Sequence, residues 1–112
     1  MKVRFHGGDV RLRLSEEDLS LLNHGSSVHS LTPMQEGPPF EILLAIDSSI
    51  HEVAIHATNR DVEFKFPLTE NLAALLSRES ISYSVKLMTE DGPLNLCLER
   101  DLGRGMHLGD SE

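Results

Sequence analysis

A six-residue pattern that occurs twice is the feature that most limits how this chain can fold. Asp9–Leu14 reads Asp-Val-Arg-Leu-Arg-Leu, and fifty-two positions later Asp61–Phe66 reads Asp-Val-Glu-Phe-Lys-Phe. Both segments alternate polar and apolar residues, as a half-buried strand does. The apolar positions that follow also match: Leu19 and Leu22 with Leu72 and Leu75, Val28 with Ile81, and Pro39-Phe40 with Pro93-Leu94. We therefore expect two copies of a unit that is too short to bury a core alone.

The length of 112 residues is typical of one domain. We predict a single domain over residues 1–102, built from two pseudo-repeats at about 1–47 and 53–101. Residues 103–112 contain three glycines and two acids, and they are expected to form a flexible acidic tail.

Each unit reads as strand, strand, helix, strand, strand. Gly7-Gly8 predicts a two-residue hairpin turn with positive φ angles, and Ser15 and Thr69 are typical helix N-caps. Asp91-Gly92 predicts a second hairpin turn. The expected strands are Lys2–Phe5, Val10–Leu14, Val28–Leu31, Phe40–Asp47, Val53–Ala57, Val62–Phe66, Ile81–Met88 and Leu94–Leu98.

The predicted fold class is α+β, with an internally duplicated, mainly antiparallel unit and two short helices. The eight strands would form a barrel-like structure or two packed sheets, because either arrangement buries the apolar faces. An open sheet with both helices on one face and an exposed edge for dimerisation is the alternative. Expected core positions are Val3, Phe5, Val10, Leu12 and Leu14, equivalent to Ile55, Ala57, Val62, Phe64 and Phe66.

Composition narrows the classes of partner and the compartment. Eighteen acidic and ten basic residues give a formal charge of −8, which repels nucleic acid and anionic membranes. The longest apolar run, Ile42–Ile46, is far shorter than the roughly twenty residues of a membrane helix. Cys97 cannot form an internal disulfide, and no signal peptide precedes the first strand, so a cytoplasmic location is expected.

The first hairpin predicts a ladder of like charges. With Gly7-Gly8 in the turn, Arg4 lies opposite Arg11 and Lys2 lies opposite Arg13. Such pairs are destabilising unless negative charge lies nearby. Either Glu99 and Asp101 neutralise this basic ladder, or it binds an anion such as phosphate or a carboxylate. We expect pairing within the chain, because acids are in excess.

At the positions equivalent to Arg4 and Arg11, the second hairpin does not pair like charges. The same register places His56 opposite Glu63, a polar pair that satisfies itself and indicates a structural role. The alternative is a small enzyme, or a metal- or anion-binding protein, that uses the polar face of the first hairpin with His6, His56 or Glu63. None of the six histidines has ligand spacing, so no metal, cofactor or catalytic residue is predicted.

The two ends of the chain also carry a resemblance. Met1-Lys2-Val3-Arg4, Gly8, Val10–Ser15 and the acidic stretch up to Leu19 resemble the start of a family of small uncharacterised bacterial proteins. Leu98–Leu102 is similar to the closing strand of that family, although its members continue with a Cys and an Arg where this chain has only Arg104 among glycines. The resemblance implies a bacterial cytosolic protein of about this length, with no assigned activity.

These observations together favour a non-enzymatic binding or interaction module. Its partner would be an unidentified protein or a small anionic ligand, and neither nucleic acid nor a membrane is expected. A homodimer stays open as an assembly.

Overall fold

The computed structural model of the chain describes residues 1–102, and the predicted tail, 103–112, lies outside the described residues. The observed element order is the predicted one, and each strand has one or both boundaries moved by one or two residues. The elements are β1 (Lys2–His6), β2 (Asp9–Leu14), α1 (Glu16–Asn23), β3 (Val28–Thr32), β4 (Phe40–Ile46), β5 (Ala54–Ala57), β6 (Asp61–Phe66), α2 (Glu70–Leu76), β7 (Ser82–Thr89) and β8 (Gly92–Arg100).

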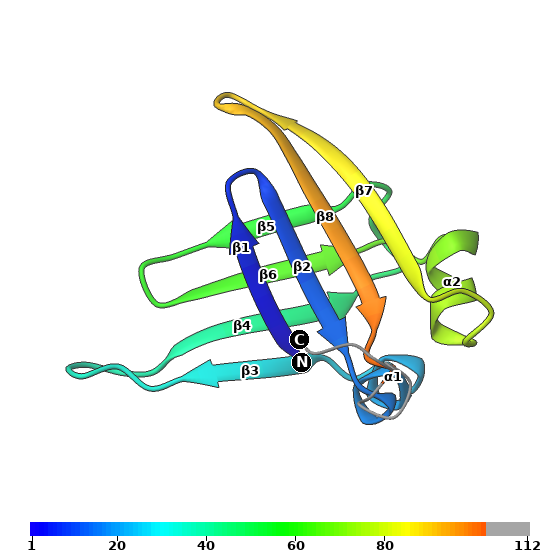
Figure 1. Cartoon of the computed structure of the whole chain (residues 1–112), viewed down its shortest axis with the longest axis horizontal. Helices are drawn as coiled ribbons and strands as arrows, with labels where there is room; N and C mark the ends of the chain where they lie inside the picture. The colour runs from blue at the N-terminus through cyan, green and yellow to red at the C-terminus, as the bar shows by residue number, and fades with distance from the viewer. Residues whose placement is uncertain (103–112) are drawn as a thin grey trace, which may run out of the picture.

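The strands form two four-stranded sheets with the orders β1-β2-β8-β7 and β3-β4-β6-β5. Four antiparallel pairings are joined by two parallel ones, β2 with β8 and β4 with β6. The sheets pack face to face with their strands crossing, and both helices lie at one end of the molecule (Figure 1). The predicted α+β fold with two packed sheets is therefore confirmed, whereas the closed barrel and the open single sheet were wrong.

Both sheets follow the same plan. Replacing each strand of β1-β2-β8-β7 by the strand four places earlier or later in the chain gives β5-β6-β4-β3. This is the order of the other sheet, read from its opposite edge. Each sheet thus joins a hairpin from residues 1–47 to a hairpin from the second half. Val28 lies opposite Leu44 and Tyr83 lies opposite Leu98 in the corresponding hairpins. The position equivalent to Val28 is therefore Tyr83 and not Ile81, whose side chain is 57% exposed.

The core lies between the two inner sheet faces and the helices. Leu12, Leu14, Phe64 and Phe66 are buried, as alternation predicts. Phe5, expected in the core, is 56% exposed, and Ala57 is also exposed. The prediction that these two residues are buried was wrong, because both lie on edge strands beside the turns, where the other sheet covers less of the surface. The buried hydrophobic side chains of the core are Val10, Leu12, Leu14, Leu19, Leu22, Val28, Ile42, Leu44, Phe64, Phe66, Leu72, Leu75, Leu76, Leu96 and Leu98.

Local hydrogen bonds fix where α1 begins. The Ser15 hydroxyl accepts from the Asp18 N–H, and the Asp18 carboxylate accepts from the Ser15 N–H, which is a capping box. The same carboxylate lies 2.9 Å from the amino group of Met1, a partly buried residue. Burial by itself raises the pKa of Asp18, but the Ser15 N–H and the Met1 ammonium together hold this pKa below its ordinary value.

The turn of the first hairpin needs its two glycines for different reasons. Gly7 has a φ of 58°, as predicted, but Gly8 does not share the positive φ. A Cβ on Gly8 would lie 2.8 Å from the Pro93 carbonyl oxygen, and the Gly8 carbonyl accepts from the Asn95 N–H at 2.7 Å. Gly8 therefore allows a close approach to the β7-β8 hairpin. In that hairpin Thr89 pairs with Gly92, so Glu90 and Asp91 form the turn, one position earlier than the predicted Asp91-Gly92.

Candidate anion-binding site

The outer face of the β1-β2-β8-β7 sheet carries the predicted basic ladder. The observed register places Arg4 opposite Arg11 and Lys2 opposite Arg13, as the hairpin pattern predicts. The parallel pairing of β2 with β8 then extends each pair across the sheet. We call this surface the basic face; its three rows are Lys2, Arg13 and Glu99, then Arg4, Arg11 and Cys97, then His6, Asp9 and Asn95.

Two of the four cations have acidic partners. Arg13 Nε donates to Glu99 Oε1 at 3.3 Å, and Lys2 Nζ lies 3.9 Å from Asp101 Oδ2. These are the two acids that the sequence indicated. The prediction of pairing within the chain is therefore confirmed for Lys2 and Arg13.

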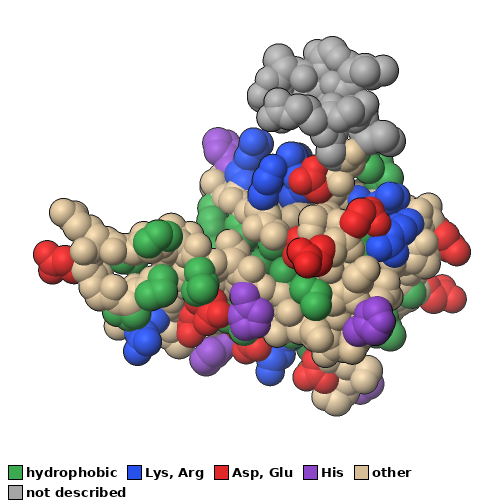
Figure 2. All heavy atoms as spheres, turned by 90° about the horizontal axis from the view of Figure 1, so that it is seen from below, with side chains coloured by type: hydrophobic (Ala, Val, Ile, Leu, Met, Phe, Trp, Pro, Cys, Tyr) green, Lys and Arg blue, Asp and Glu red, His purple; other side chains and the backbone are tan. Residues whose placement is uncertain are grey.

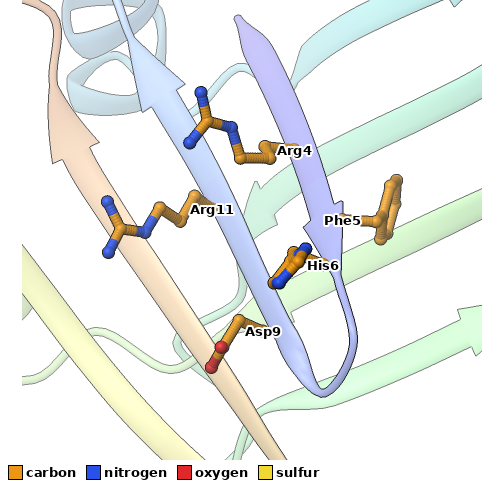
Figure 3. A pocket seen from close by; sticks show the side chains of 5 residues that line it. All are labelled: Arg4, Phe5, His6, Asp9 and Arg11. Carbon is orange, nitrogen blue, oxygen red and sulfur yellow. The ribbon is translucent and has the colours of Figure 1, made fainter.

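The other two cations, Arg4 and Arg11, make no ion pair with any residue in the described range 1–102. For these two, the prediction of neutralisation within the chain was wrong over that range. Figure 3 shows both guanidinium groups on the same side of the hairpin, while Phe5 points away from them. They line a surface depression of about 530 Å³. Two arginines that lie opposite each other in the hairpin register therefore line one open hollow.

The turn end of the depression is polar but less basic. His6 and Asp9 close the hairpin there, as Figure 3 also shows. Asp9 Oδ1 accepts a hydrogen bond from Asn95 Nδ2 at 3.0 Å. This bond ties Asp9 to β8 and places one carboxylate among the residues that line the depression.

The thiol of Cys97 sits in the row of Arg4 and Arg11, where sequence reasoning did not place it. Its Sγ lies 3.8 Å from Glu99 Oε2 and 3.9 Å from the Leu98 carbonyl oxygen. The alternation of β8 put Cys97 on the face opposite Leu96, but nothing in the sequence pairs β8 with β2.

The outer face of the second sheet has a different composition. His56 lies opposite Glu63 in the predicted register, yet no hydrogen bond joins the two side chains. The closest histidine–carboxylate contact described is between His29 Nδ1 and Glu41 Oε2, at 2.6 Å, across β3 and β4. Sequence reasoning missed it because a long loop joins these strands. Figure 2 shows a group of Lys and Arg side chains on the upper side of the molecule with one histidine beside it, and the other visible histidines lie lower.

Two further features are absent from residues 1–102. No group of three or more His, Cys, Asp or Glu side chains is arranged to hold a metal ion there. Neither helix in this part of the chain has the length and apolar character needed to cross a membrane.

The geometry defines a class of protein: an α+β protein of two crossed four-stranded sheets, one of which carries facing arginines on its outer face. The chain belongs to a family of unknown function (DUF7009), whose model matches residues 1–104. The expected resemblance to an uncharacterised family is thereby confirmed. No curated protein and no solved structure matches the chain.

Proposed function

We propose that this protein is a binding module that holds a small oxyanion, of the phosphate or carboxylate type, between Arg4 and Arg11. The observation that carries the proposal is the lack of an ion pair at these two residues within the described chain, although Lys2 and Arg13 beside them have one. Like charges directly opposite each other on a sheet are destabilising, and a bound anion removes that cost.

The chemistry of arginine suits such a ligand. Each guanidinium is planar and offers paired N–H donors that match two oxygens of a phosphate or carboxylate group. The depression of about 530 Å³ falls within the range of small-molecule sites. Because the site is open to water, we expect affinity on the order of 0.1–1 mM for a simple inorganic anion.

The overall charge of the chain favours a small anion over a nucleic acid as the ligand. The formal charge of −8 repels a polyanion, whereas a small anion meets only the local field of the two arginines.

We also infer that the two halves of the chain are copies of one unit that have diverged in this role. The common plan of the two sheets and the equal spacing of the Arg4–Arg11 and His56–Glu63 pairs support the inference. In the second hairpin the two positions hold groups of opposite character. The first hairpin alone would therefore serve the anion.

Titration calorimetry with inorganic phosphate and with pyrophosphate tests the function. The double variant Arg4→Gln/Arg11→Gln should bind at least ten times more weakly than the unmodified chain, because it removes both guanidinium groups. The matched control, Arg60→Gln/Lys65→Gln, removes two cations from the other hairpin and should bind as the unmodified chain does. Added sodium chloride should weaken the binding. Equal loss in both variants, or no binding of either anion, would overturn the proposal.

A further inference from the structure

The strand β7 is the most open edge of the two sheets. It forms one edge of the β1-β2-β8-β7 sheet and has eight residues, against five in β1, five in β3 and four in β5, the other edge strands of the described chain. Proteins normally protect sheet edges by keeping them short or by placing charges or proline on them. β7 has no proline and a single charged residue, Lys86.

The hydrogen bonds to β8 identify which backbone groups of β7 are unpaired. The Arg100 N–H donates to the Ile81 carbonyl at 2.9 Å, directly before the register in which Ser82 lies opposite Glu99. In an antiparallel pair, hydrogen-bonded and non-hydrogen-bonded positions alternate. The N–H and C=O groups of the even-numbered residues therefore point away from β8, toward the free edge. Among these, Ser84 and Lys86 receive no hydrogen bond on that side within residues 1–102.

The side chains along this edge leave room for a neighbour. Ser82, Ser84 and Lys86 are exposed, and Met88 at the end of the strand is 75% exposed, the largest value among the big apolar side chains described. Figure 1 shows β7 at the margin of its sheet, with no further strand beside it. By contrast, β1 carries Lys2 and Arg4, so a second β1 beside it would add to the charge repulsion.

We propose that β7 pairs antiparallel with β7 of a second copy of this chain. A strand that pairs antiparallel with itself forms a symmetric contact, in which the same surface serves both subunits. Pairing centred on Val85 places each Lys86 opposite Ser84 of the partner subunit, so the two like charges do not meet. It also brings the Met88 end of each strand against the Ser82 end of the other. The β1-β2-β8-β7 sheets of the two subunits then form one continuous sheet of eight strands.

Light scattering coupled to size-exclusion chromatography, on the full chain, tests the proposal. The unmodified chain should have twice the mass of one 12.5 kDa chain. Ser84→Pro should have the mass of one chain, because proline removes an N–H that points to the free edge and leaves the bonds to β8 in place. The matched control Ser84→Thr keeps the N–H and should have the dimer mass. The double variant Arg4→Gln/Arg11→Gln should also be dimeric, which separates this proposal from anion binding.

Amide hydrogen exchange covers the case in which Ser84→Pro does not fold. In the unmodified chain, the Ser84 and Lys86 amides should exchange slowly at high protein concentration and faster on dilution. A single-chain mass at high concentration overturns the proposal, as does a dimer that persists in folded Ser84→Pro. Fast, concentration-independent exchange of the two amides also overturns it.

Discussion

Asp18 offers the sharpest test of how the described interactions stabilise the fold. Its carboxylate caps α1 through the Ser15 N–H and contacts the amino group of Met1, both at 2.9 Å. The change Asp18→Asn keeps the size of the side chain but removes the negative charge beside the Met1 ammonium. Hydrogen bonds to charged groups typically contribute about 1.5–3 kcal/mol, and we expect a loss in this range. For a chain of this length, the melting temperature should fall by about 5–15 °C.

The pH dependence of this loss follows from the lowered pKa of Asp18. A carboxyl group whose pKa is lower in the folded state contributes stability above its unfolded pKa, and that contribution disappears as the pH falls through the folded pKa. The difference in unfolding free energy between the unmodified chain and Asp18→Asn should therefore be largest near neutral pH. It should shrink once the pH drops below 3.8, the ordinary value for this group.

Urea unfolding monitored by circular dichroism, over a series of pH values, measures both effects. Glu17→Gln is the matched control, because it removes an exposed acid from the same helical turn. The control should lose no more than about 0.3–1 kcal/mol, the usual helix-dipole contribution. If Asp18→Asn costs as little as the control, the ion pair between Asp18 and Met1 does not stabilise the fold as argued. A loss that stays constant down to pH 2 would contradict the pH argument.

Two further predictions concern packing. Phe64→Ala should cost about 3–5 kcal/mol in urea unfolding, because Phe64 is 2% exposed, whereas Phe5→Ala should cost about 1 kcal/mol; equal losses would contradict the described core. Gly8→Ala should cost about 1–3 kcal/mol, because its methyl group would meet the Pro93 carbonyl, while Gly7→Asn should cost little, since Asn tolerates a positive φ. A harmless Gly8→Ala would show that the two hairpins lie further apart than described.

Features set by neighbouring residues could be predicted from the sequence. The glycine turn and the alternation of Val3, Phe5, Val10 and Leu12 fixed the register of the first hairpin, so Arg4 was correctly placed opposite its partner. The helix caps were equally local, because a capping side chain bonds to backbone groups only two or three residues away.

The arrangement of the sheets could not be predicted, because it depends on contacts between distant segments. Nothing in the sequence of β2 identifies β8 as its parallel neighbour. The position of Cys97 beside Arg11 could therefore not be predicted. For the same reason, the acids Glu99 and Asp101 could be named as partners of the basic ladder, but which two cations they neutralise could not. The exposure of Phe5 depends on where the other sheet ends, which alternation does not encode.

The parallel pairing of β2 with β8 has a consequence for synthesis on the ribosome. Arg13 and Glu99, which meet across these strands, are 86 positions apart in the chain. Because translation proceeds from the N-terminus, the first hairpin leaves the ribosome long before the strand that completes its sheet. Its inner apolar residues, among them Leu12 and Leu14, are not fully buried until that strand has been synthesised. Contacts of such long sequence separation also slow folding. The nascent chain therefore depends most on protection from aggregation during the interval before β8 emerges.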